Sequence, residues 1–317
     1  VSLESVKLNQ SVKANTGETR MADDSSQIHF NVREDLGGGL AAVGKLDLRF
    51  KYDDSGTTGA ANVGGQVGAG NTYVGLSSKQ WGMVLFGRHD LHYFNHESRL
   101  TGKGTLRADA TSLISHIQGT PIANTSRTQN VVRWLSPNWG GFTMIAAYST
   151  NPTGNDNDIN SGGRKGSGWN LNPNMRGANY QVGYSYWSAK PDVIPTAAVP
   201  AGFAFSTTTG LAVATAAVAA TAAATNQRGD RLYGSYSWGG FRLGLAWDKS
   251  RLWNSKTGVQ AARRTAWAIP VEYVTGNHNF LMHYTKARND TVTAAQDGAK
   301  MIALTYGYDL SKRTMVG

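Results

Sequence analysis

The chain has 317 residues, of which 40% are hydrophobic and 38 are glycine, and it contains no cysteine. Disulfides and thiolate metal sites are therefore excluded, and no run approaches the ~18 consecutive apolar residues that a transmembrane helix requires. The formal net charge is +10, but the basic residues are scattered singly and form no cluster, so nucleic acid is not a predicted partner.

The first segments of the chain alternate between apolar and polar side chains. Residues 27–33 read QIHFNVR, and residues 45–52 read KLDLRFKY. Side chains of a strand point alternately to its two faces. Each segment therefore predicts a strand with one apolar face and one polar or charged face.

The same pattern recurs along the chain and predicts about fifteen strands. In chain order they cover residues 3–13, 27–33, 40–52, 72–77, 83–89, 130–135, 142–149, 166–175, 180–187, 232–238, 241–252, 265–274, 280–286 and 301–308, with a further strand opening at 313. Short turns alternate strictly with long loops, as in bacterial outer-membrane barrels, which have even strand numbers. We therefore predict a single all-β domain, 1–317, that forms a transmembrane antiparallel β-barrel of 16 strands, with the closing strand missing from the chain as given.

Two long segments interrupt this alternation. Residues 90–128 show no sustained pattern, and residues 188–229 contain a low-complexity run of Ala, Thr and Val. Alanine favours helix, so the second segment could carry a short helix, but a plain insertion in a long extracellular loop is the preferred interpretation.

Five short motifs lie in register along the chain. They are EDLGGGL at 34–40, NTYVGLS at 71–77, LFGR at 85–88, SPNWGGF at 136–142 and YDLSKRT at 308–314. Together they resemble the general porins of β-proteobacteria. The resemblance implies a homotrimeric, water-filled pore of 16 strands in the outer membrane, with the third long loop, here 90–128, folded inward to form the constriction. The chain departs from the family in its first strand, its absent last strand and its Ala-rich segment.

A pore needs a narrow water-filled passage with an electric field across it, and basic side chains in that passage favour anions. Arg33, Lys45 and Arg49 share the polar parity of their strands, and Arg133 has inward parity in 130–135. Arg88 matches a position whose arginine, in the resembling family, belongs to the basic wall of the constriction. Alternatively, some of these residues line the lumen far from the constriction.

The predicted counter-wall is the loop 90–128. Its candidate acidic residues are Glu97 and Asp109, although both could simply pair with arginines of the same loop. His89, His92 and His96 have a spacing that could bind a metal on a helix, but no HExxH pattern surrounds them, and loop polarity is the simpler explanation. No cofactor is predicted.

These observations predict a general diffusion porin, not an enzyme, that passes small hydrophilic solutes and prefers anions. Its partners would be outer-membrane lipid and lipopolysaccharide, two copies of itself, and the solutes. The alternatives are a substrate-selective channel on the same barrel, a surface adhesin with a sealed lumen, or an outer-membrane enzyme. An enzyme would need Ser or Asp beside an inward histidine, and no motif near the inward His283 provides one.

Overall fold

A computed structural model describes most of the strands of the chain and part of the connections between them. The described residues are 2–6, 18–22, 27–49, 68, 70–92, 116–117, 120–121, 127–152, 166–190, 202–205, 212–215, 225–255, 257–293, 297–312 and 314–316.

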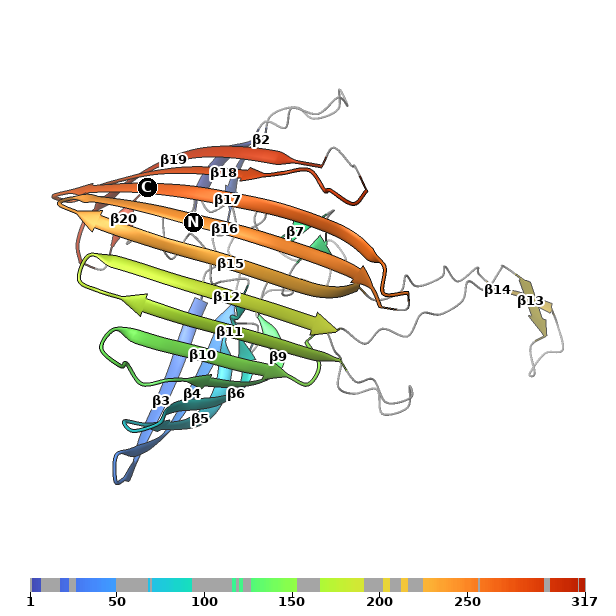
Figure 1. The fold of residues 1–317 in the computed structure, drawn as a ribbon, viewed down its shortest axis with the longest axis horizontal. Coiled ribbons are helices and arrows are strands. Elements are labelled where there is room, and N and C mark those ends of the chain that lie inside the picture. The colour runs from blue at the N-terminus through green and yellow to red at the C-terminus, as the bar shows by residue number, and fades with distance from the viewer. Residues whose placement is uncertain are drawn as a thin grey trace.

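One antiparallel sheet of 14 strands dominates the structure. Its strands are β3 (Gln27–Gly37), β4 (Leu40–Arg49), β5 (Thr72–Ser78), β6 (Gly82–His89), β9 (Thr128–Leu135), β10 (Phe142–Ser149), β11 (Ser167–Arg176), β12 (Tyr180–Lys190), β15 (Thr225–Trp238), β16 (Phe241–Asn254), β17 (Gln260–Thr275), β18 (His278–Ala287), β19 (Ala299–Asp309) and β20 (Met315–Val316). Each strand pairs with the next of this series. The sheet curves round, and its short turns gather at one end (Figure 1).

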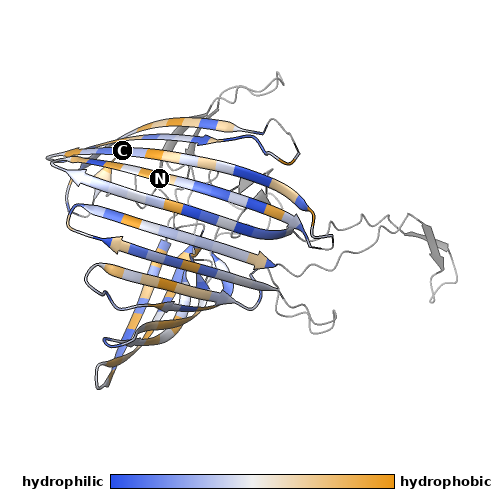
Figure 2. Ribbon diagram, viewed as in Figure 1, coloured by the Kyte–Doolittle hydropathy of each residue, from blue (hydrophilic) through white to orange (hydrophobic). Residues whose placement is uncertain are grey.

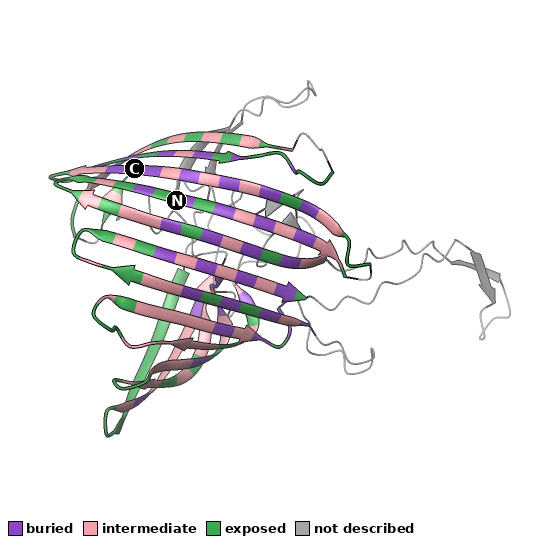
Figure 3. Ribbon diagram, in the orientation of Figure 1, coloured by how far each residue is buried: buried purple, intermediate pink, exposed green. Residues whose placement is uncertain are grey.

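Burial along the strands is the reverse of that in a water-soluble protein. In β16, Leu243, Leu245 and Trp247 are exposed, whereas Ala246 and Asp248, which have the opposite parity, are buried. Hydropathy alternates along many of the strands (Figure 2), and burial alternates most clearly from β11 to β18, whereas β3 is exposed along its whole length (Figure 3). An outside that is apolar and an inside that is polar is the arrangement of a membrane-spanning barrel, so the predicted all-β barrel class is confirmed.

Most predicted strands match observed ones, but three expectations need correction. The segment 3–13 does not join the main sheet in the described part of the chain, because β1 (Ser2–Val6) pairs with β2 (Glu18–Ala22) in a separate sheet. Strict alternation of short and long connections fails at residues 255–259, which join β16 to β17 by a short connection on the long-loop side. Within the Ala-rich segment, β13 (Gly202–Phe205) and β14 (Ala212–Thr215) form a hairpin, and the described part shows no helix there.

The limits of the two long segments also differ slightly from those expected. β6 ends at His89 and β9 starts at Thr128, so the third long connection is 90–127. β12 continues to Lys190 and β15 starts at Thr225, which shortens the connection expected at 188–229. Among the described residues, no helix has the length and apolar character that crossing a membrane requires.

Candidate pore constriction

The predicted basic residues of β3 and β4 face inward but at different levels. Asn31 lies opposite Lys45, and Gln27 lies opposite Arg49. Arg33 lies opposite Val43, six residues from Arg49, which corresponds to about 20 Å along the strand. Arg49 therefore lies near the long-loop end of the barrel, Lys45 lies near its middle, and Arg33 lies towards the short turns.

Arg49 is held by a buried carboxylate on its own strand. Its Nε and Nη2 donate to the two oxygens of Asp47 at 2.7 and 3.0 Å, a bidentate geometry. The Asp47 side chain is 1% exposed, and it also accepts a hydrogen bond from the Asn71 backbone N–H at 3.1 Å. The ring of His29 lies 3.3 Å from the same carboxylate. Asp47 therefore fixes the guanidinium on the inner wall.

Asn71 connects this pair to the start of the third long connection. Its side-chain amide donates to Asp90 at 2.5 Å, and the backbone N–H of Asp90 donates back to the Asn71 oxygen at 2.6 Å. Asp90 also lies 3.0 Å from Nε of Arg127, just before β9. Two arginine–carboxylate pairs, Arg49–Asp47 and Asp90–Arg127, are thus linked through the neutral Asn71, and this network joins the two ends of the connection 90–127 to the wall of β4.

Arg88 lies at the end of β6, beside this network. Strict alternation would turn it to the same face as the exposed Phe86. The pairing of β6 with β9 shifts register between Gly87 and His89. The extra residue lies on β9, where Gln129 and Asn130 together oppose Arg88 and Asn130 has φ +56°. Gly87 on β6 has φ +146°, and a Cβ there would lie 2.3 Å from the Thr72 carbonyl oxygen. Arg88 lies close enough to Asp90 and Arg127 for their charges to interact.

Arg133 completes the basic side of the wall from β9. It lies opposite Leu85 of β6 and Ala147 of β10, which are both buried inside the barrel. Its charge acts on the His89 ring, which stacks on Tyr73 with 4.9 Å between centroids. The structure therefore brings Arg49, Arg88 and Arg133 to the region where the third connection begins. It adds Arg127, which sequence reasoning placed in the loop and did not select.

The first described residues of the third connection lie against the far strands of the barrel. Nδ1 of His92 lies 2.9 Å from the Ser185 hydroxyl of β12, and the His92 carbonyl accepts a hydrogen bond from Arg231 of β15 at 3.2 Å. Arg231 pairs with Asp248 of β16 at 3.0 Å, and both side chains are almost completely enclosed, at 0% and 1% exposure. His92, Ser185, Arg231 and Asp248 form what is called here the His92 cluster.

Packing around the His92 cluster also indicates that the third connection runs into the barrel. A Cβ on Gly229 would lie 2.6 Å from Nε2 of His92, so glycine provides the room for the ring. The neighbouring Leu91 belongs to a buried apolar group with Trp187 and Leu252, among others. Further along the connection, β7 (His116–Ile117) lies beside β16 and β17. These described parts of the third connection therefore lie against the inner wall of β12 and β15–β17.

The structure describes some of the remaining predicted residues and not others. Glu97 and Asp109 lie outside the described residues. His283 has the predicted inward orientation and is buried. In the described part of the chain, no group of three or more His, Cys, Asp or Glu side chains is placed to hold a metal ion.

The His92 cluster superficially matches the order of groups in a hydrolytic triad. Ser185, His92 and Asp248 follow one another, with His92 Nε2 and the Asp248 carboxylate 3.7 Å apart. However, Asp248 is already occupied by Arg231 and by the Ser250 hydroxyl at 2.6 Å, and all these groups are buried. A nucleophile must be reachable by its substrate, so this arrangement positions the loop and does not suit hydrolysis.

Comparisons with known proteins agree with this architecture. The structure is similar to an anion-selective porin from Comamonas acidovorans, with a TM-score of 0.66 and 18% identity, over 95% of this chain and 79% of that one. It is also similar to OmpF of Salmonella typhi in complex with daunomycin, with a TM-score of 0.62 and 15% identity, over 97% and 84% of the two chains. Both likenesses concern the fold.

Sequence comparison identifies the family. An outer membrane porin protein of Bordetella pertussis is 32% identical over 133 residues, which are 42% of this chain and only 32% of that relative. The sequence model described as Gram-negative porin matches residues 2–317. The resemblance seen in the sequence motifs is confirmed. The chain belongs to the Gram-negative porin family.

Proposed function

We propose that this chain forms a passive diffusion pore for small hydrophilic solutes and ions, with a preference for anions. The observation that carries the proposal is the polar inner face of a barrel whose outer face is apolar. Such a barrel encloses a water path across the membrane. The similar fold of an anion-selective porin supports the same direction of selectivity.

The balance of charge on the described inner face supports anion preference. Each of its main carboxylates has an arginine close by: Asp47 with Arg49, Asp90 with Arg127, Asp248 with Arg231, and Glu272 with Arg242. Lys45 and Arg88 add positive charge beyond these pairs. A narrow lumen with low-dielectric walls screens such charges less than an open surface does, so the anion concentration inside is raised.

In this proposal the connection 90–128 narrows the pore. Arg49, Arg88, Arg127 and Arg133 form the basic wall beside it, with Lys45 deeper in the lumen and Arg33 towards the short turns. Glu97 and Asp109 remain the proposed acidic residues of the loop. The contacts of His92 with the far wall support an inward course of this loop.

We further propose that the pore is a homotrimer surrounded by outer-membrane lipid. The continuous apolar outer face is suited both to lipid and to neighbouring protomers. One experiment tests pore and assembly together: the protein is inserted into a planar bilayer under a KCl gradient. We expect conductance steps in groups of three and a zero-current potential with the sign of chloride preference. Absence of conductance would contradict the pore, and potassium preference would contradict the selectivity.

A further inference from the structure

The connection 191–224, between β12 and β15, is almost without charge. Its one charged residue is Asp192, and residues 193–224 contain no Asp, Glu, Lys, Arg or His, with alanine, threonine and valine making up most of the segment. The connection lies on the side of the long loops, which in an outer-membrane barrel faces the outside of the cell. Surfaces in contact with water usually carry charged residues of both signs. This segment is therefore suited to a contact from which charge is excluded.

Two strands of this connection form a hairpin that stands apart from the barrel. Ala204 of β13 lies opposite Val213 of β14, and Gly202 lies opposite Thr215. In the described part of the chain, no third strand pairs with either of them. Figure 1 shows the hairpin away from the main sheet, on the side of the long connections. Because a single two-stranded hairpin is only marginally stable in water, a further strand at one of its edges would stabilise it.

The two edges of the hairpin differ in how the sequence protects them. Natural edge strands use proline and charged residues to prevent pairing with another chain, since proline lacks the N–H that a neighbouring strand would need. The residues before β13 include Pro191, Pro195 and Pro200. By contrast, β14 lies within residues 211–224, which contain no proline, no glycine and no charged residue. The unprotected edge is therefore that of β14.

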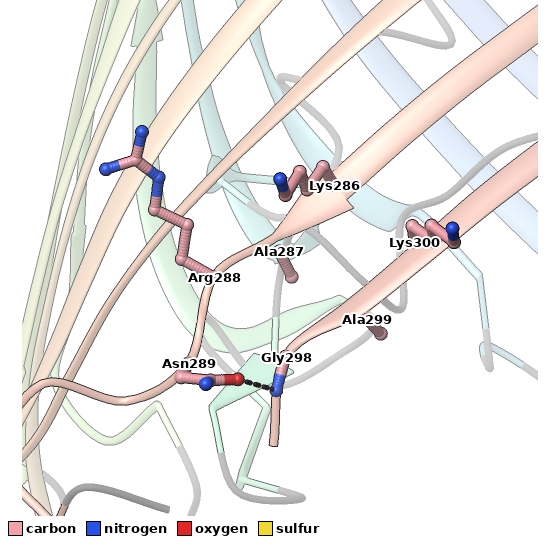
Figure 4. Close-up of a pocket in the computed structure, with 7 residues that line it drawn as sticks. All are labelled: Lys286, Ala287, Arg288, Asn289, Gly298, Ala299 and Lys300. Atoms are coloured by element: carbon pink, nitrogen blue, oxygen red, sulfur yellow. Dashed lines mark hydrogen bonds between the residues drawn. The ribbon is translucent and has the colours of Figure 1, made fainter. Parts of the chain in front are cut away.

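Charge elsewhere on the molecule determines which partner suits this edge. The protein has a formal net charge of +10, and Lys286, Arg288 and Lys300 lie where β18 ends and β19 begins, at the end of the barrel that carries the long connections (Figure 4). Two copies that met through these ends would bring like charges together, which is unfavourable. A strongly charged partner would gain no ionic contact from the hairpin. An equally uncharged strand suits it, and a second copy of β14 is such a strand.

We propose that the edge of β14 pairs with the edge of β14 in a second copy of the chain and so links two pores outside the membrane. Antiparallel pairing of two identical edges has a twofold axis, so the contact is self-complementary and closes as a pair. It would produce a four-stranded sheet in the order β13–β14–β14–β13, in which main-chain hydrogen bonds provide the affinity. The inference concerns contacts between pores and is independent of conductance and ion selectivity.

The test places a charge in the middle of β14. Val213→Lys and Val213→Glu each bring two like charges close together at the paired edges, and each should weaken association about tenfold. An equal mixture of the two variants should associate like the wild type, because lysine then meets glutamate. Ser255→Lys adds the same charge to an exposed position of the short connection between β16 and β17, at the same end of the barrel, and should change nothing. Sedimentation equilibrium in detergent, over a range of protein concentrations, measures the mass of the particles.

Three outcomes would overturn the proposal. These are a wild-type particle mass that stays constant with concentration, equal association of Val213→Lys and the wild type, and a mixture that associates no better than either variant alone. Unchanged single-channel conductance of the variants shows that the barrel is intact. If the wild type does not conduct, the association result can still be interpreted, since it is measured without conductance.

Single cysteines provide a second measurement of the same contact. The chain contains no cysteine, so an introduced one reports only on its own position. Oxidation should produce disulfides between copies at one or more positions from 211 to 217, and none with Ser255→Cys. Disulfides formed by Ser255→Cys and by no position from 211 to 217 would show that the ends of the barrels meet and the hairpins do not.

Discussion

Asp47 shows how a single inward carboxylate can organise the inner wall. A buried carboxylate requires charged and hydrogen-bonding partners, and Asp47 has Arg49, His29 and the Asn71 backbone within reach. These contacts fix Arg49 in one orientation. Alternation alone predicts that Asp47 and Arg49 share a face, but it does not predict this contact with Asn71, which lies 24 residues away in the sequence.

His92 gives the third connection a dependence on pH. Burial first, and then the charge of Arg231, lower the pKa of His92 below its ordinary value, while Asp248 and Asp230 act in the opposite direction. The docked ring is therefore neutral. Below about pH 6.5 an undocked imidazole takes up a proton that the docked one does not. Docking should weaken by about 1.4 kcal/mol per pH unit until the docked ring is itself protonated.

Hydrogen exchange of the peptide containing residues 90–92, corrected for the intrinsic rate at each pH, measures this effect. Protection should be full above pH 7 and fall between pH 6.5 and 5. His92→Gln keeps a hydrogen-bonding side chain but cannot titrate in this range, so its protection should not follow pH. Equal protection of the wild type at pH 7 and pH 5 would show that His92 does not control docking.

The strands were largely predictable because their faces meet different solvents. β10 has the expected bounds, 142–149, since the glycine turn at 140–141 directly before it marks its start. β15 begins at Thr225, seven residues before its expected start. The first part of this strand was missed because Arg228 and Asp230 point outward while Arg231 points inward. Because charged residues occur on both faces of this part of the strand, apolar and polar residues do not alternate there. The hairpin β13–β14 was missed because alanine and threonine leave no alternation of hydropathy.

The two faces of a strand should respond in opposite ways to a charge. Leu304 and Thr305 are neighbours on β19, and Leu304 is exposed on the apolar outer face while Thr305 faces inward. Leu304→Arg should cost about 2–4 kcal/mol if it lies near the bilayer midplane. Thr305→Arg should cost much less, because its side chain reaches lumen water. Denaturant unfolding in lipid vesicles compares the two, and equal losses would contradict the assignment of the faces.

At the scale of the whole molecule, the site depends on contacts between segments far apart in the sequence. Asp90 and Arg127 meet at the two ends of a long connection, and His92 meets Arg231 from another part of the barrel. The sequence indicates which positions face inward, but not which loop residues cross the lumen. Arg88 was found through the family resemblance alone, since strict alternation assigns it to the face of the exposed Phe86.

Selectivity is the property to which all these charges contribute. Replacing Arg49 and Arg88 with Glu removes two positive charges near the third connection and adds two negative ones. If these residues set the field of the pore, the zero-current potential in a KCl gradient should move strongly towards potassium or change sign, and 1 M salt should reduce the shift because the Debye length is then about 3 Å. Arg49→Gln/Arg88→Gln should move it less, in the same direction.

A matched control separates a local field from overall net charge. Arg263→Glu/Arg288→Glu changes the charge of the protein equally, but both side chains are exposed on the outer face. This variant should keep a potential close to that of the wild type, since lipid and the barrel wall lie between its charges and the water path. If the inner and outer double variants shift the potential equally, the field of the whole protein sets selectivity and the proposed basic wall is wrong, whereas the barrel itself would stand.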